Sequence, residues 1–156
     1  MEGIRVDFPG GPPIRLTHLL LDFTGTLAKD GALIPGVAER LKALSRNLTV
    51  IVLTADTFGT ARAALKDLPI EVHLVRTGRD KAKFIEGLVG AEGIAAIGNG
   101  RNDIEMLKLA HLGIAVIGPE GCAAELLFAA KIVARDILDA LDVVANPLRV
   151  KATLRD

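Results

Sequence analysis

Short apolar runs alternate along this sequence with segments in which apolar residues recur at the three- and four-residue spacing of a helix face. The runs predict strands, and the helical spacing predicts the helices that cover them. In chain order we expect strands at 18–23, 49–53, 71–75, 94–97, 112–117 and 132–134, and helices at 37–44, 57–66, 81–89, 102–110, 121–130 and from 136 onward. Such alternation is typical of right-handed crossovers in a parallel sheet. The pattern therefore predicts an α/β fold, a three-layer, Rossmann-like parallel sheet with helices on both faces.

Residues 3–16 precede this alternation and have a different pattern. Two short apolar stretches flank 8–13, which read Phe-Pro-Gly-Gly-Pro-Pro and are rich in turn-forming residues. They predict an N-terminal β-hairpin. The length of 156 residues fits one domain over 1–156, with the hairpin in 1–17 and the core in 18–145.

Composition and charge narrow the classes of function. Lysine plus arginine and aspartate plus glutamate each total 19, so the net charge favours neither a nucleic acid nor an anionic membrane as partner. The N-terminus lacks the basic and apolar regions of a signal peptide, and no apolar run reaches the roughly 18 residues that cross a bilayer. The single cysteine, Cys122, cannot form an internal disulfide, and the histidines fit no zinc pattern. We therefore expect a cytoplasmic protein with no nucleic-acid and no membrane partner.

Polar residues with catalytic potential stand where predicted strands end, which is where ligands bind in open parallel sheets. The apolar strand 18–21 runs directly into Asp22, whose carboxylate can attack phosphorus if the charges of both anions are neutralised. Mg²⁺ would neutralise them, held by Asp22, the backbone carbonyl of Thr24 and an oxygen from 99–103. Backbone N–H groups of residues 24–26 can cradle phosphate oxygens. This segment therefore predicts a phosphoryl-transfer site.

Two more strand ends supply groups for the same phosphate. Thr54 can donate a hydroxyl hydrogen bond, and Lys81 would lie against the phosphate and the Asp22 carboxylate as a point charge. Each feature taken alone has a structural explanation, as an Asx-type turn at Asp22, a strand-end or N-cap threonine, a solvated lysine, and a turn at 99–103 that caps the next helix. The four together, in this order and each at a strand end, favour the functional interpretation.

Four segments carry a resemblance to a known family. They are Asp22-Phe23-Thr24-Gly25-Thr26-Leu27, Leu53-Thr54-Ala55-Asp56, the run from Asp80-Lys81 to Leu88, and Gly98-Asn99-Gly100-Arg101-Asn102-Asp103. The chain resembles the haloacid dehalogenase superfamily of phosphohydrolases, and within it the phosphorylation domain of P-type ATPases. The resemblance implies an aspartyl-phosphate at Asp22 and three sets of site residues: catalytic Asp22, Thr24 and Lys81; substrate-binding Thr26, Thr54, Ala55 and Asn102; and Mg²⁺-binding Asp22, Thr24, Asn99 and Asp103.

Two departures from the family's pattern affect the expected chemistry. The residue two positions after the nucleophile is usually an aspartate that acts as general acid and base, but here it is Thr24, as in the ATPases. Because a positioned acid–base group supplies ~10²–10⁴-fold in rate, hydrolysis of the phospho-enzyme should be slow. The fourth motif usually begins with an aspartate metal ligand, but here Asn99 offers an uncharged oxygen. Asp103 would then be the main carboxylate partner of Asp22, and Mg²⁺ affinity should be weaker.

The segments between the motifs are short. Residues 28–53 and 55–80 leave no room for a cap domain or for the nucleotide-binding domain of the ATPases. We therefore expect a capless, slow, Mg²⁺-dependent phosphatase that acts on a small-molecule or macromolecular phosphomonoester. A homo-oligomer formed through the apolar N-terminal hairpin is one way to cover the open site.

Two other functions were weighed against this one. The first is a phosphate-responsive regulatory or scaffold protein with little turnover, which Thr24 and Asn99 favour because a long-lived phospho-aspartate resembles a signalling state. The second is carbon–halogen hydrolysis, which the superfamily also includes. Thr54, Lys81 and the metal-binding loop disfavour it, because they are the groups that phosphate needs.

Overall fold

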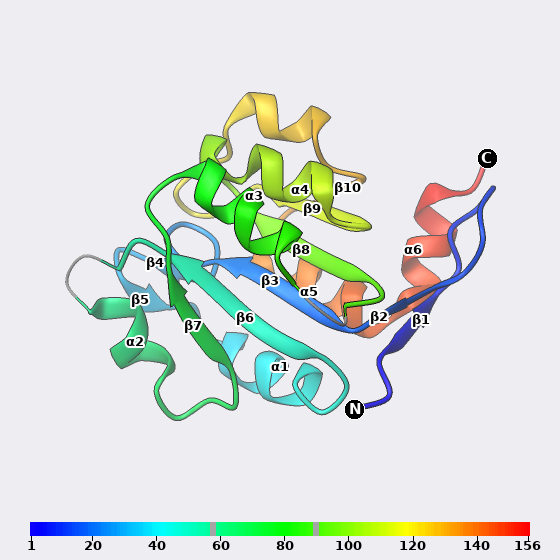
Figure 1. Cartoon of the computed structure of the whole chain (residues 1–156). Coiled ribbons are helices and arrows are strands. Elements are labelled where there is room, and N and C mark those ends of the chain that lie inside the picture. Colours follow the sequence, from blue (N-terminus) through cyan, green and yellow to red (C-terminus); the bar gives the residue numbers. More distant parts are fainter. Residues whose placement is uncertain (57–58, 89–90) are drawn as a thin grey trace.

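The computed structural model describes residues 1–56, 59–88 and 91–156. Its centre is a sheet of six parallel strands in the order β10-β9-β8-β3-β6-β7 (Figure 1). In chain order these strands are β3 (His18–Asp22), β6 (Thr49–Thr54), β7 (Glu71–Leu74), β8 (Ile94–Gly98), β9 (Leu112–Val116) and β10 (Ile132–Ala134). The predicted parallel, Rossmann-like fold is confirmed, and each of these strands ends within about one residue of its expected bounds.

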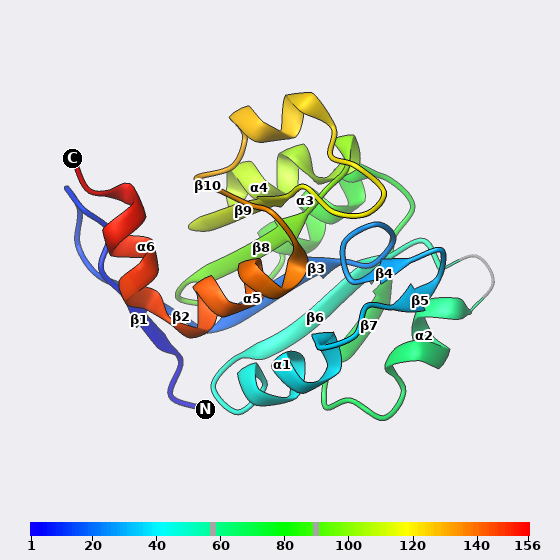
Figure 2. The same ribbon diagram turned by 180° about the vertical axis from the view of Figure 1, so that it is seen from behind.

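Helices cover both faces of the sheet, as strands that are apolar on both sides require. The helices α3 (Gly78–Glu86) and α4 (Ile104–Leu109) lie on one face (Figure 1). The helices α1 (Val37–Leu44) and α5 (Ile137–Ala145) lie on the other face (Figure 2). The three-layer architecture is thus confirmed. No helix within the described residues is long and apolar enough to cross a membrane.

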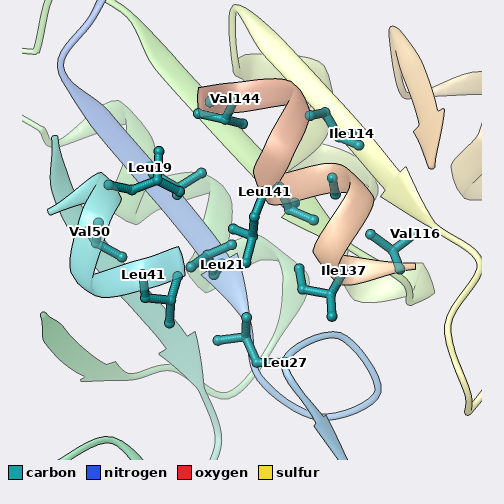
Figure 3. Close-up of a cluster of buried hydrophobic side chains, with 14 of the residues drawn as sticks. Leu19, Leu21, Leu27, Leu41, Val50, Ile114, Val116, Ile137, Leu141 and Val144 are labelled. Carbon is teal, nitrogen blue, oxygen red and sulfur yellow. The ribbon is translucent and has the colours of Figure 1, made fainter. Parts of the chain in front are cut away.

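Alternate residues of β3 enter two hydrophobic cores. Leu20 packs on the side of α3 and α4, whereas Leu19 and Leu21 pack on the side of α1 and α5, and all three are fully buried. Figure 3 shows the second core, where Leu41 of α1 and Leu141 of α5 gather with the β3 side chains. Burying each leucine contributes about 1.5–3 kcal/mol, so this central strand is held firmly from both faces.

The strands β1 (Ile4–Val6) and β2 (Ile14–Leu16) form the predicted N-terminal antiparallel hairpin. Its inward residues Val6 and Leu16 are fully buried. The last helix, α6 (Pro147–Leu154), packs against β1 (Figure 2). The chain therefore covers the apolar side of its own hairpin, and contact with a second copy through the hairpin stays a prediction.

Several helices begin at residues other than those expected, among them α4, which begins at Ile104 rather than at 102. The helix α3 starts at Gly78 rather than at 81, because Thr77 and Asp80 form a capping box that satisfies the first backbone N–H groups. The helix α2 (Thr60–Leu65) lies inside the expected range 57–66. The predicted start of that range at Thr57 and the predicted end of the following helix at Val89 lie outside the described residues.

Three other segments also differ from the expectation. The segment expected as a helix at 121–130 is a short 3₁₀ helix, η2 (Ala124–Phe128). The helix expected from 136 is interrupted at Asn146, and Pro147 begins α6. An unexpected small hairpin joins β4 (Ala28–Lys29) to β5 (Ala32–Leu33) through Asp30-Gly31, both with positive φ, which is a favoured two-residue hairpin turn.

Candidate functional site

The predicted site residues meet at the carboxyl edge of the sheet. Asp22 is the last residue of β3, and it lies level with Leu53, one residue before Thr54 ends β6. On the other side of β3, Leu21 is level with Ile97, so the loop that follows β8 begins beside Asp22. These strand ends surround a cleft of about 490 Å³, which is lined by Asp22, Phe23, Thr24, Gly31, Thr54, Ala55, Asp56, Thr60, Val75, Arg76, Lys81, Asn99, Gly100, Asn102 and Glu120.

The chain turns sharply directly after Asp22. Gly25 has φ of +76° at the turn, and a Cβ there would lie 2.5 Å from the Asn99 amide nitrogen, so both conformation and space call for glycine. The N–H groups of Gly25 and Thr26 donate to Ala28 and Phe23 carbonyl oxygens within the turn. Two of the three amides predicted to cradle phosphate are therefore engaged in the turn itself, whereas Thr24 lines the cleft.

Lys81 lies between two buried carboxylates. Its Nζ donates to Asp22 Oδ1 at 3.0 Å and to Asp103 Oδ1 at 2.7 Å, and none of the three side chains is more than 10% exposed. Burial, and then the charge of Asp103, raise the pKa of Asp22 to about 6, although Lys81 opposes the rise. Burial acts to lower the pKa of Lys81, but the two carboxylates outweigh it and the pKa is raised. The ammonium is therefore charged wherever Asp22 is ionised.

The carboxylate of Asp103 also shapes the loop after β8. Its Oδ2 accepts hydrogen bonds from the N–H groups of Asn99 at 3.2 Å and Gly100 at 3.1 Å. A Cβ at Gly98 would collide with this carboxyl group, so the close approach depends on glycine. Since Oδ1 holds Lys81, both oxygens of Asp103 are already engaged. Asp103 is thus placed to orient the loop and the lysine.

Asn99 has a defined amide orientation. Its Nδ2 donates to the Gly121 carbonyl oxygen at 3.0 Å, which directs Oδ1 toward the Thr26 hydroxyl at 3.1 Å. The same hydroxyl donates to Asp22 Oδ2 at 3.0 Å. Thr26 is fully buried and does not line the cleft, so its side chain supports the nucleophile, and its predicted contact with substrate stays untested.

These oxygen atoms form a donor set of the type that Mg²⁺ takes. Asp22 Oδ2 and Asn99 Oδ1 converge on one hydroxyl, and Thr24 lines the cleft beside them. Carboxylate, amide and backbone oxygens suit a hard cation, with water completing its shell. No group of three or more histidine, cysteine, aspartate or glutamate side chains that could hold a metal lies in residues 1–56, 59–88 and 91–156. The donor set fits a magnesium ion held by few protein charges.

The other predicted site residues have distinct positions. Thr54, Ala55 and Asn102 all line the cleft. The Thr54 hydroxyl is nearly buried and accepts a hydrogen bond from the N–H of Asp56 at 3.3 Å, so its own proton is directed elsewhere. Asp56 itself caps α2, since its two carboxylate oxygens accept from the N–H groups of Ala61 and Arg62.

Several residues that line the cleft are not among the predicted ones. Arg76 follows the end of β7, and the strand-end rule that singled out Thr54 could have found it. Thr60, Gly31 and Glu120 belong to loops and a helix start that reach the cleft only in the folded chain. Glu120 accepts a hydrogen bond from the N–H of Asp30 at 3.0 Å, a contact across 90 residues that no local pattern reveals.

Comparison with known proteins places these features in a family. A family model for haloacid dehalogenase-like hydrolases matches residues 53–118. An uncharacterized protein from Methanocaldococcus jannaschii is 54% identical over 63 residues, which make up 40% of this chain and 68% of that protein. The residues that the family model matches include Thr54, Lys81 and Asn99.

Two solved structures are similar in fold. The 3-deoxy-D-manno-octulosonate 8-phosphate phosphatase from Moraxella catarrhalis, in complex with magnesium, phosphate and KDO, has a TM-score of 0.71 at 18% identity and covers 89% of each chain. A zinc-transporting PIB-type ATPase in the E2P state has a TM-score of 0.63 at 24% identity, covering 78% of this chain and 20% of that one. At these identities the similarity shows the common fold.

Proposed function

The chain belongs to the haloacid dehalogenase-like hydrolase family, and from that premise we propose that it is a Mg²⁺-dependent phosphatase. It would hydrolyse phosphomonoesters through an aspartyl-phosphate at Asp22. The observation that carries the proposal is the buried contact between Asp22 and Lys81 at the base of the cleft, with 3.0 Å between Oδ1 and Nζ. The folds of the phosphatase and of the ATPase are similar to that of this chain, and the activity itself is the proposed step.

The geometry assigns each side chain a task. Lys81 and Thr26 hold one carboxylate oxygen each, so the Asp22 carboxylate cannot rotate freely before it attacks. Thr54, Ala55 and Asn102 line the cleft above it, where the non-bridging phosphate oxygens would lie. The ammonium of Lys81 offsets charge that develops on the phosphoryl group. Asp22 is therefore both positioned and electrostatically supported as a nucleophile.

The reaction would proceed in two displacements. In the first, an Asp22 oxygen forms a bond to phosphorus while the bond from phosphorus to the ester oxygen breaks, and the released alkoxide takes a proton from water. In the second, water attacks phosphorus, the bond to Asp22 breaks, and inorganic phosphate leaves. Mg²⁺, held by Asp22, the carbonyl of Thr24 and Asn99, would supply Lewis-acid neutralisation of the phosphate charge.

The second displacement should be the slow one. Thr24 stands where an acid–base carboxylate would serve the attacking water, and a threonine hydroxyl does not exchange protons in this way near neutral pH. A persistent phospho-Asp22 is therefore expected. This same feature supports the alternative function, a phosphate-responsive regulatory or scaffold protein with little turnover.

One comparison separates these functions. The wild-type protein and the Asp22→Asn variant are incubated with Mg²⁺ and p-nitrophenyl phosphate, and phosphate release is followed over many turnovers. Asp67→Asn makes the same chemical change at an exposed position and serves as the matched control. We expect release from the wild type and the control, and none above background from Asp22→Asn.

The other outcomes are equally informative. Equal release from all three proteins would remove the enzymatic proposal. Stoichiometric labelling of the wild type that then persists, without further release, would favour the regulatory alternative. Because labelling also depends on Asp22, a mass increase of one phosphoryl group in the intact wild-type protein that is absent from Asp22→Asn assigns the label to Asp22 in either case.

A further inference from the structure

The cleft contains one charged side chain that its own structure leaves without a partner. The charged residues in the lining are Asp22, Asp56, Arg76, Lys81 and Glu120. Lys81 binds Asp22, Asp56 accepts from the first amides of α2, and Glu120 accepts from the N–H of Asp30. Within the part of the chain that the structure describes, no acceptor meets the guanidinium of Arg76.

The backbone of Arg76 is fixed from two sides. The N–H of the preceding residue, Val75, donates to the Thr54 carbonyl oxygen at 2.9 Å, which extends the β6–β7 pairing by one residue. The N–H of Arg76 itself donates to Asp80 Oδ2 at 3.0 Å, beside the capping box of α3. Since α3 also carries Lys81, one helix start positions the backbone of both cationic residues of the cleft.

The sheet register places Arg76 beyond the level of the nucleophile and two strands to its side. Asp22 is level with Leu53, and Leu53 is level with His73, three residues before Arg76. At about 3.3 Å per residue in an extended chain, Arg76 lies roughly 10 Å further along the strand direction than Asp22. Because Arg76 also lines the cleft, a guanidinium at that position can reach what lies beyond the phosphorus atom, which is the alcohol part of a phosphomonoester.

We propose that Arg76 binds a second acidic group, a carboxylate or a further phosphate, on the alcohol part of the substrate. Guanidinium forms paired, charge-assisted hydrogen bonds with both groups. Glu120 lines the same cleft and disfavours an anion on its own side, which confines the acidic group to the Arg76 side. The inference rests on the proposed phosphatase function, because it names the substrate class of that site.

Three small esters test the preference. Phosphoglycolate carries a carboxylate, ethylene glycol bisphosphate carries a second phosphate, and ethylene glycol monophosphate carries a neutral hydroxyl. The measurement is the ratio of kcat/KM for each acidic ester to that for the neutral one, with Mg²⁺ present. Arg76→Ala should lower that ratio by about ten- to a hundredfold, mainly through KM, because one paired charge-assisted contact is lost. The acidic ester whose kcat/KM ratio falls identifies the acidic group that Arg76 binds.

Two further variants test whether the change in the ratio is specific to the guanidinium of Arg76. Arg79→Ala removes a guanidinium from the first turn of α3 that does not line the cleft, so the ratio should stay at its wild-type value. Arg76→Lys keeps the charge without the paired geometry and should give an intermediate ratio. An unchanged ratio in Arg76→Ala, or an equal fall for acidic and neutral esters, would overturn the inference while leaving the phosphatase proposal intact.

Binding gives a separate test that needs no turnover. Calorimetry with the Asp22→Asn protein and Mg²⁺ compares phosphoglycolate with ethylene glycol monophosphate, with and without Arg76→Ala. Tighter binding of phosphoglycolate that disappears with Arg76→Ala would support the inference even if the wild type released no phosphate. Equal affinity for the two esters, or binding of neither, would contradict it whatever the activity.

Discussion

Replacing Lys81 by methionine should reveal how strongly the protein depends on one buried cation. Methionine keeps most of the apolar stem of lysine and removes the ammonium. Asp22 and Asp103 would then face each other as buried carboxylates, with side chains 10% and 0% exposed, and without the group that now bridges them at 3.0 and 2.7 Å. Removing one partner of such a buried arrangement typically costs about 3–5 kcal/mol of unfolding free energy.

The loss should depend on pH in a definite direction. In the wild type the pKa of Asp22 is raised to about 6 in the folded state, so the folded protein binds this proton more tightly than the unfolded chain. Its contribution to stability is complete below the unfolded value of about 3.9 and is lost as pH rises through about 6. Without Lys81, which lowers this pKa, the loss extends to higher pH. The deficit of the variant should therefore be larger at pH 8 than at pH 5.

The assay is chemical denaturation of the wild type and Lys81→Met at both pH values, without divalent metal. A loss of 3–5 kcal/mol corresponds to a fall in melting temperature of roughly 6–20 °C for a chain of this size. Lys83→Met, an exposed position on the same helix, should lose less than about 1 kcal/mol.

A double variant decides whether uncompensated charge is the cause. Lys81→Met combined with Asp103→Asn removes one of the two negative charges and should recover part of the lost stability at pH 8. A deficit below about 1 kcal/mol, or one that is equal at both pH values and not relieved in the double variant, would refute the electrostatic reasoning.

Three further predictions concern the nucleophile and its loop. Thr24→Asp should raise the rate at which the phospho-enzyme hydrolyses by ~10²–10⁴-fold in single-turnover assays, and no increase would contradict the role given to this position. Gly98→Ala should cost at least about 1–3 kcal/mol in denaturation, because its methyl group collides with the Asp103 carboxyl, whereas Gly11→Ala has open space and should cost little. The plot of kcat/KM against pH should rise through about 6 or below, as Asp22 ionises. If the midpoint of this rise does not change with the Mg²⁺ concentration, metal contact with Asp22 is contradicted.

Strands were predictable from this sequence and helix starts were less so. Strands such as β3 and β8 are short apolar runs, and their burial on both faces of the sheet leaves no other place for them. The start of α3 depends on a capping box in which a threonine side chain and an aspartate side chain satisfy backbone groups reciprocally. Apolar periodicity does not carry this signal.

The candidate site was likewise predictable from the sequence only in part. Asp22, Thr54 and the 99–103 loop could be predicted because parallel strands bring their carboxyl ends to one edge. The division of work between Asn99 and Asp103 could not, because it depends on the Asn99 amide nitrogen donating to the Gly121 carbonyl oxygen and on an Asp103 carboxylate oxygen accepting from Lys81. Motif spacing shows that two polar groups are near each other, but it does not show which of their atoms are already engaged.

The position of β3 in the sheet also has a consequence for synthesis of the chain. β3 comes first among the sheet strands in sequence, yet it lies between β6 and β8, and Leu21 pairs with Ile97. Until residues 94–98 leave the ribosome, β3 has an open edge of apolar sequence, which is a template for wrong pairing. Productive folding must therefore await a partner more than 70 residues downstream, so slowing elongation before β8 should raise aggregation more than slowing it afterwards.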